Sequence, residues 1–178
     1  MPSNRPDVAP DVKRQEIRQA ARTLFFREGY DQAGMTRIAR EAGVAANTLY
    51  WYYPGKDELF AAVVGELVDA FLAGLASRDP DESLESTLRW AVETLETARP
   101  LIVTVHDKSL TSEAVARVHD HFHQSVEEWM AEVLKKRGMD EDRIPAFINI
   151  VTFVVEGLVM HELPRAEKEA VMHQLASG

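Results

Sequence analysis

The sequence predicts an all-α protein of about nine helices, and three observations support this prediction. Apolar residues recur three and four positions apart along nearly the whole chain, which is the spacing of one helix face. No stretch alternates apolar and polar residues with the period of two that strands show. Glycine and proline separate the periodic segments, at Gly29, Gly43, Pro54, Pro100 and Gly138. A length of 178 residues allows a small head and a larger body.

The first part of the chain predicts an arm followed by three helices. Residues 1–10 contain three prolines and are expected to form a flexible arm. A first helix is expected at residues 11–29, with an apolar stripe at Ile17, Ala20, Ala21, Leu24 and Phe25. Two short helices follow, one between Gly34 and Gly43 and one at Asn47–Tyr53. Two short helices joined by a glycine turn are typical of a helix-turn-helix.

The remainder predicts a helical body. A fourth helix is expected from Asp57 to about Ser77, opened by acidic residues that suit a helix N-terminus. Further helical segments are expected at 81–97, 101–110, 113–137, 143–162 and 164–176. We therefore expect three parts: the arm at 1–10, a head at 11–56 and a body at 57–178.

The helix at Asn47–Tyr53 has an unusual outward face. If Leu49 points inward, Asn47 and Trp51 point outward at about 100° per residue, with Thr48 and Tyr50 beside them. Such side chains can donate to phosphates, contact base edges and stack on sugars. The alternative is an aromatic core helix that packs on both sides, but a segment this short has few neighbours to bury two faces.

Charge is unevenly distributed along the chain. The total is −9, yet residues 13–56 contain eight basic and four acidic residues, a net charge of +4, which leaves −13 for the remainder. A positive head on an acidic body is typical of a protein that binds a polyanion at one end. Chance clustering of charge is the alternative.

Residues 17–64 resemble the DNA-binding signature of the TetR family of transcriptional regulators. The matching residues are Gly29-Tyr30, Ile38-Ala39, Ala42-Gly43-Val44, Thr48-Leu49-Tyr50-Trp51, Tyr52-Tyr53 and Lys56-Asp57-Glu58-Leu59. Two positions depart from the family pattern. Gly34 stands where the family usually has Ser or Thr, and Ala45 where it often has Ser. Since glycine is an acceptable N-cap and alanine a poor one, the motif is expected to be slightly less stable than usual.

The resemblance implies a double-stranded DNA operator as partner and assigns the contacts. Thr36, Ala46, Asn47 and Thr48 occupy positions that face bases. Tyr50, Trp51, Tyr52 and Lys56 occupy positions that face the DNA backbone, and Arg37 is assigned to the same DNA-binding surface. Because Ala46 offers only a methyl contact, Asn47 and Thr36 are expected to carry more of the specificity.

The body is expected to bind a small-molecule effector, as the resemblance implies. Candidate residues are aromatic or ionisable: Trp90, His106, His119, Phe122, His123, Trp129, Phe147 and Glu156. Most of the aromatic ones also suit a plain core, although a cavity between helices would need such a lining. His161 is expected to be a satisfied core histidine in an apolar helix.

A metal site is a weaker alternative in the body. His119, His123 and Glu127 recur every four residues on one helix face, and His106-Asp107 could complete a site. The same residues also suit a solvated polar face opposite an apolar stripe. We predict no metal and no cofactor.

The helix at 143–162 is apolar around more than one face. Its core stripe is already wide, and Ile150, Phe153, Gly157 and Met160 lie outside it. Left in water they would form an exposed apolar patch. We therefore expect these residues, with Ala170 of the last helix, to form the interface of a homodimer.

Several functional classes find no support in the sequence. There is no cysteine, no phosphate-binding glycine loop, no nucleophile elbow and no HExxH. We expect no membrane span and no signal peptide, and hence a cytoplasmic protein that is not an enzyme. The expected function is that of a ligand-responsive repressor that binds a palindromic operator. The alternative is a helical metal- or small-molecule-binding protein, or an enzyme, whose head only resembles a DNA-binding motif.

Overall fold

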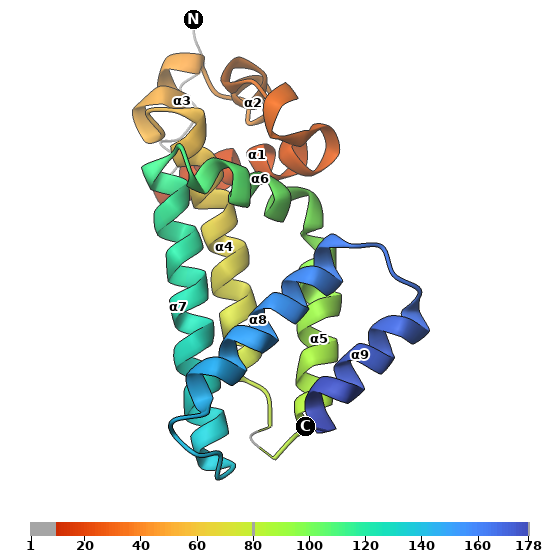
Figure 1. Cartoon of the computed structure of the whole chain (residues 1–178). Coiled ribbons are helices and arrows are strands. Elements are labelled where there is room, and N and C mark those ends of the chain that lie inside the picture. The colour runs from red at the N-terminus through yellow and green to blue at the C-terminus, as the bar shows by residue number, and fades with distance from the viewer. Residues whose placement is uncertain (1–9, 80, 178) are drawn as a thin grey trace, which may run out of the picture. The chain divides into compact units, whose positions relative to one another are not determined.

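The computed structural model describes residues 10–79 and 81–177, whose regular structure is entirely α-helical (Figure 1). The expected all-α fold is therefore confirmed. The described helices are α1 (Pro10–Gln32), α2 (Met35–Glu41), α3 (Ala46–Tyr52), α4 (Lys56–Ala76), α5 (Leu84–Thr97), α6 (Arg99–Ser109), α7 (Glu113–Lys136), α8 (Ile144–Met160) and α9 (Arg165–Ser177). The arm expected at 1–10 lies outside the described residues except for Pro10, which starts α1.

The described helices form two compact units. Among the described residues, the first unit contains 10–67 and Thr104–Val118, and the second contains 68–79, 81–103 and 119–177. The helices α4, α6 and α7 contribute residues to both units. The first unit is thus larger than the head expected at 11–56, because it also takes in the start of α4 and a segment far along the chain.

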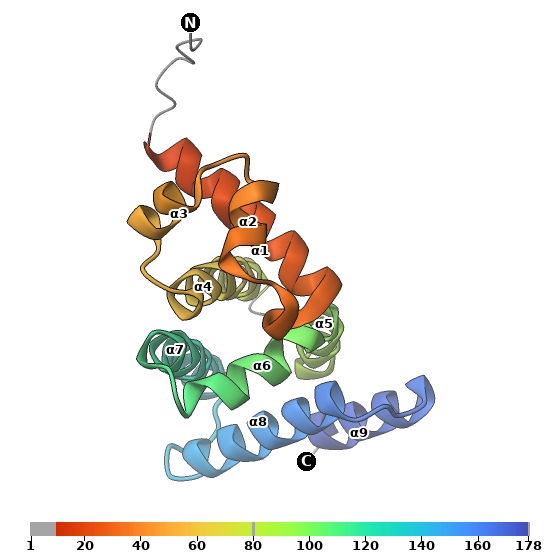
Figure 2. The ribbon, with the colours of Figure 1, turned by 90° about the horizontal axis from the view of Figure 1, so that it is seen from above.

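The first unit is built around an apolar core supplied by four helices. In this unit α1 packs against α2, and α2 packs against α3 (Figure 2). Fully buried side chains of these four helices include Ile17, Ala21, Leu24, Phe25, Ile38, Leu49, Leu59, Phe60 and Val63, and Ala33 and Val115 of the same unit are also fully buried. Their spacing on α1 is the predicted stripe. The rings of Phe25 and Phe60 meet edge to face, with centroids 5.2 Å apart, and so join α1 to α4.

Two glycines shape this unit because they adopt positive φ angles. Gly29 has φ 80° near the end of α1, and Gly43 has φ 65° between α2 and α3. A side chain with a Cβ rarely adopts such angles, whereas glycine does so at little steric cost. The turn between α2 and α3 at Gly43 and the bend near the end of α1 at Gly29 are therefore encoded locally.

The helix α4 bears on the expectation that no segment spans a membrane. Among the described helices, it is long and apolar enough to cross a membrane by length and composition. Its residues Leu59, Phe60 and Val63 are fully buried within the first unit. Core helices pass the same test, because a helix that buries most of its surface is apolar around most of its circumference.

The second unit contains a separate apolar core. Both α8 and α9 pack on α5. The buried cluster consists of Leu88, Val92, Met130, Leu134, Ile144, Ile148, Val151, Leu158, Val159 and Met172. Polar contacts also join α9 to α5: Arg89 forms an ion pair with Glu169 at 3.0 Å, and His173 Nδ1 lies 2.9 Å from Glu85 Oε2. The core stripe predicted for α8 is thus confirmed.

Candidate nucleic-acid interface

The helix α3 presents the face that the sequence predicts. Leu49 is fully buried and Tyr53, just past the helix end, is 7% exposed. In contrast, Trp51 is 73% exposed and Tyr50 48% exposed, and Asn47 is also exposed. The alternative of an aromatic helix buried on both sides is therefore wrong. An indole left in water on a seven-residue helix indicates a surface that binds a partner.

Both short helices begin without a side-chain cap. Gly34 is the N-cap of α2 and Ala45 the N-cap of α3, and neither provides a hydrogen bond to the first turn. The backbone of both caps is extended, with φ −74° at Gly34 and φ −69° at Ala45. The first N–H groups of α3 therefore have no side-chain acceptor from the N-cap residue.

The start of α2 presents an exposed Thr36 and an arginine held by a carboxylate. Arg37 Nη1 lies 2.6 Å from Glu28 Oε2, and its Nη2 donates to Glu28 Oε1 at 2.8 Å. Arg27 donates to the same Oε1, also at 2.8 Å through Nη2. The Arg37 side chain is 45% exposed, so part of its guanidinium faces solvent while Glu28 sets its orientation.

Lys56 has partners inside the protein. Its ammonium donates to the carbonyl oxygen of Tyr30 at 3.0 Å and lies 4.1 Å from the centroid of the Tyr30 ring. It therefore satisfies a carbonyl at the end of α1, in addition to the backbone-facing role that the resemblance implies. Ala46 is half-buried and Thr48 is exposed at the start of α3.

Arg14 joins this surface, although no sequence motif assigns it a role. Its guanidinium lies 5.6 Å from the centroid of the Tyr52 ring. Tyr52 in turn meets Trp51 edge to face, with centroids 4.7 Å apart. The three side chains form a cationic and aromatic edge along α3 that brings α1 into the candidate interface. Only the positive charge of the head pointed to Arg14, because the contact joins residues far apart in sequence.

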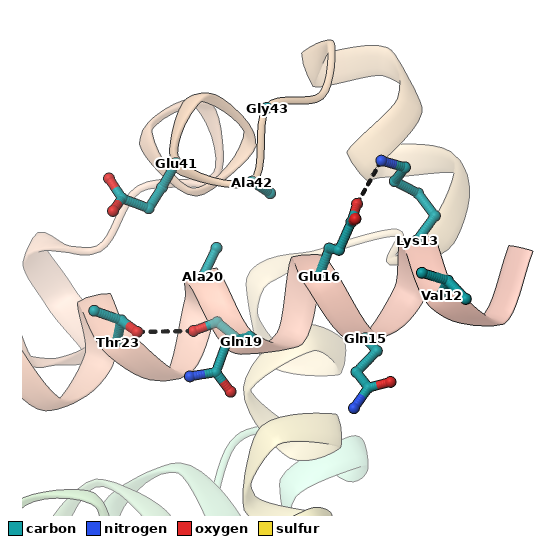
Figure 3. A pocket seen from close by; sticks show the side chains of 10 residues that line it. All are labelled: Val12, Lys13, Gln15, Glu16, Gln19, Ala20, Thr23, Glu41, Ala42 and Gly43. Carbon is teal, nitrogen blue, oxygen red and sulfur yellow. Dashed lines mark hydrogen bonds and ion pairs between the residues drawn. The ribbon is translucent and has the colours of Figure 1, made fainter. Parts of the chain in front are cut away.

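A polar groove lies beside this edge in the first unit. It runs between the first half of α1 and the turn after α2, where Ala20 points toward Ala42 (Figure 3). Lys13 on its wall is paired with Glu16 at 2.5 Å, and Glu41 lines the opposite side. Two carboxylates in the groove disfavour DNA phosphate, so we do not include it in the interface.

Part of the predicted effector set gathers in the second unit. The rings of Phe71 and Trp90 stack with centroids 5.0 Å apart, and Phe71 also meets Phe122 at 5.5 Å. His123 Nε2 lies 3.7 Å from Glu156 Oε1. Phe122 and His123 contact each other, and His119 and His123 have centroids 4.5 Å apart. Phe71 is the member of this group that is not among the effector candidates expected from the sequence.

The other effector candidates lie elsewhere or have a structural role. Trp129 and Phe147 are partly buried against the core of the second unit. His106 belongs to the segment counted with the first unit. His161 is exposed at the C-cap of α8, so the expectation of a core histidine is wrong. The helix α8 ends at Met160, so His161 lies just past the apolar run and not within it.

The described residues contain no group of three or more side chains that could hold a metal ion. Glu127, the third member of the possible metal set, is exposed. The carboxylate that pairs with His123 is Glu156 from α8 instead. The set of His119, His123 and Glu127 is therefore not assembled as a metal site in the described part of the chain.

The expected interface residues on α8 are available in the single chain. Phe153 is 71% exposed and Ile150 51% exposed, and Ala170 of α9 is exposed as well. Gly157 and Met160 are half-buried, and a Cβ added at Gly157 would meet nothing within 4 Å. The space above Gly157 is thus open in this unit.

Comparisons with known proteins agree with this geometry. Residues 17–63 match the family model described as "Bacterial regulatory proteins, tetR family". The HTH-type transcriptional regulator LmrA of Bacillus subtilis (strain 168) is 26% identical over 175 residues, which cover 90% of this chain and 91% of that protein. The expectation that the chain is not an enzyme agrees with these names.

Solved structures share the whole fold. A transcriptional regulator from Rhodococcus sp. Rha1 has a TM-score of 0.75 at 19% identity, covering 92% of each chain. The multidrug binding protein EbrR, solved in complex with imidazole, has a TM-score of 0.66 at 18% identity and covers 92% of this chain and 94% of its own. The matched helix-turn-helix, the full-length regulator relative and the shared fold lead to one conclusion: residues 17–63 are a DNA-binding region of the TetR family of transcriptional regulators.

Proposed function

We propose that this regulator is a repressor that binds a palindromic operator as a homodimer and is released by a small-molecule effector. The observation that carries the proposal is the exposed face of α3, where Trp51 is 73% exposed beside Tyr50 and Asn47. Asn47 and Thr36 would read bases, with Thr48 and Ala46 beside them. Tyr50, Trp51, Tyr52, Lys56 and Arg37 would contact the backbone.

A homodimer would supply the second recognition helix. Two α3 helices must lie roughly 34–36 Å apart to enter successive major grooves on one side of B-DNA. We assign the interface to Ile150, Phe153, Gly157, Met160 and Ala170, because Phe153 and Ile150 are large apolar side chains exposed to water in the single chain. A two-fold axis through this face makes the operator palindromic, since identical heads require related half-sites.

The effector would bind in the second unit. The rings of Phe71, Trp90 and Phe122 and the pair of His123 with Glu156 combine flat apolar faces with a hydrogen-bonding carboxylate. Support by analogy comes from EbrR, whose name describes multidrug binding and whose structure holds imidazole. An effector with greater affinity for the state that does not bind DNA would lower operator occupancy by shifting the population.

Selection from a randomised duplex library tests the function. The purified chain should enrich a palindromic sequence, and its affinity for the selected duplex should fall steeply as salt rises, because phosphate contacts release counterions. Enrichment of an asymmetric single site would contradict the homodimeric operator. No enrichment at low salt would contradict operator binding itself.

A reporter placed behind the selected duplex tests the direction of regulation. Expression should fall when the chain is present and recover when an effector is added. Increased expression on adding the chain would show an activator in place of a repressor.

A further inference from the structure

Tyr30 is contacted by two lysines from distant parts of the chain. The ammonium of Lys56 lies 4.1 Å from the centroid of the Tyr30 ring, and that of Lys108 lies 5.2 Å from it. Both distances fall within the range of a cation–π interaction. Tyr30 is only 7% exposed, so solvent screens these contacts less than it would on an open surface. Lys56 starts α4, whereas Lys108 lies in the last turn of α6.

The surroundings of the ring attract positive charge. The phenol of Tyr30 donates a hydrogen bond to Asp57. Burial, followed by this hydrogen bond and the charges of Asp57, Asp31 and Glu58, raises the pKa of the Tyr30 phenol well above its usual value. The ring therefore stays neutral at physiological pH, and three carboxylates near it favour an ammonium on its surface.

The backbone around Lys108 is anchored within the same unit. Its carbonyl accepts hydrogen bonds from the N–H of Thr111 at 3.0 Å and of Ser112 at 2.8 Å. Ser112 is buried, as are Val105 before it and Val115 after it. Lys108 therefore extends from a turn whose backbone is anchored within the first unit, and its ammonium also lies 4.0 Å from Asp107 Oδ2.

The contact lies next to the element that positions the recognition helix. Tyr53, Pro54 and Gly55 alone separate the end of α3 from the start of α4. Asp57 and Lys56, which hold Tyr30, belong to the first turn of α4. A shift of the Tyr30 ring against this turn would therefore tilt α3 through a very short connection.

We propose that Lys108 is a positioning residue for DNA binding, whose charge on the Tyr30 ring holds the end of α1 against the first turn of α4 and so orients α3. The proposal rests on the proposed operator binding, and it assigns Lys108 no contact with DNA. The positive charge of Lys108 is attracted by the Tyr30 ring and the neighbouring carboxylates, so an uncharged side chain of the same length would not replace it.

Substitution of Lys108 tests this role on the duplex that the wild-type chain selects from a random library. Lys108→Met keeps most of the length of the side chain but removes its charge, and should weaken binding about threefold to tenfold. The slope of log affinity against log salt should stay unchanged, because a residue that contacts no phosphate releases no counterion. Lys108→Arg should restore most of the affinity, since a guanidinium also binds a ring face.

Lys136→Met is the matched control, because Lys136 also lies in the last turn of a helix and carries the same charge. It should leave the affinity unchanged. Three results would overturn the proposal: an unchanged affinity for Lys108→Met, an equal loss for Lys136→Met, or a salt slope that falls by about one for Lys108→Met, which is the signature of a direct phosphate contact.

A double-mutant cycle with Tyr30 tests the pairing itself. In a Tyr30→Leu background, Lys108→Met should have no further effect on affinity, because the ring that it contacts is gone. In a Tyr30→Phe background the ring remains, so the loss caused by Lys108→Met should persist. Additive losses with Tyr30→Leu would show that the two residues do not act together. If the Tyr30→Leu variant fails to fold, the Tyr30→Phe background decides the question alone. Absence of the affinity loss from Lys108→Met in the Tyr30→Phe background would contradict a contact with the ring.

Hydrogen exchange gives a readout that needs no DNA. Lys108→Met should speed exchange of the amides of α3, residues 46–52, and leave the core amides of the second unit unchanged. Unchanged exchange in α3 would overturn the positioning role. If the wild-type chain selects no duplex, operator binding fails, and the exchange experiment still decides whether Lys108 holds α3.

Discussion

Asn47 and Arg14 illustrate two kinds of contact on the proposed DNA surface. Asn47 is exposed near the start of α3, where its amide can pair with a base edge. Arg14 lies on α1 with its guanidinium against the Tyr52 ring, which places a fixed positive charge beside the exposed aromatic side chains of α3. A charge of this kind attracts phosphate but reads no sequence.

Substitution of these two residues should therefore have different effects. Asn47→Ala should relax the preference at one position of each half-site, with a loss of about 1–3 kcal/mol in discrimination. Arg14→Gln should weaken all duplexes alike and lower the salt slope by about one. Competition binding with single-base variants of the selected duplex measures both effects. Identical changes in specificity for the two variants would show that these roles are wrongly assigned.

Two glycines of α4 differ in what surrounds them. A Cβ added at Gly74 would lie 2.6 Å from Cζ2 of Trp90, whereas one added at Gly65 would meet nothing within 4 Å. Gly74→Ala should therefore displace the indole and destabilise the protein by about 1–3 kcal/mol. Gly65→Ala should stabilise it by about 0.5–1 kcal/mol, because alanine is the better helix residue.

Urea unfolding followed by circular dichroism compares the two glycine variants, and fluorescence in a background with Trp51 and Trp129 replaced by Phe reports the displaced Trp90 ring. Stabilisation by Gly74→Ala would mean that the Trp90 indole can be displaced without lowering the free energy of unfolding. In that case Trp90 would be mobile enough to move aside for an effector.

At the scale of the elements, α3 is short and lacks a side-chain cap. Its N-cap Ala45 is exposed and has the extended backbone that a capping residue needs. Ala45→Ser should provide an acceptor for an N–H of the first turn and raise the free energy of unfolding by about 1 kcal/mol. Gly34→Ser at the N-cap of α2 should add only about a few tenths of a kcal/mol, because glycine is already an acceptable cap.

Thermal unfolding of the two cap variants gives the comparison. A larger gain at Gly34 than at Ala45 would indicate that serine acts through the unfolded chain, because replacing glycine removes more of its conformational freedom. No gain at Ala45 would show that the first turn of α3 is already satisfied by solvent.

At the scale of the whole molecule, the exposed face of α8 predicts self-association. Phe153→Asp should bury a carboxylate without a partner in the proposed interface, at a cost of several kcal/mol. An added Cβ at Gly157 meets nothing within 4 Å in the single chain, so Gly157→Leu should act mainly by blocking close approach of a second copy. Both variants should sediment as monomers at micromolar concentration and lose operator binding.

Gln32→Glu is the control for added negative charge, because Gln32 is exposed near the end of α1 and does not belong to α8 or α9. It should stay dimeric. A monomeric wild-type chain would contradict the homodimer, and a dimeric Phe153→Asp variant would show that another face forms the interface.

The amino-acid sequence alone predicted the elements and much of the candidate site. Helix starts, ends and buried faces follow from local rules, so the turns at Gly29 and Gly43 and the apolar stripe of α1 are encoded by neighbouring residues. The outward face of α3 followed from the same periodicity, because Leu49 defined its buried side. Such features depend on residues within one or two helical turns of each other.

Only the tertiary structure decided the contacts between distant residues. Lys108 on Tyr30, Arg14 on Tyr52 and Trp90 over Gly74 all join separate helices, and no periodicity within one helix encodes such pairs. Met172 shows the same limit, because only the structure reveals that this residue of the last helix is buried in the core of the second unit. The physical reason is that helical periodicity states which face is apolar, whereas the packing partner is chosen by the fold of the whole chain.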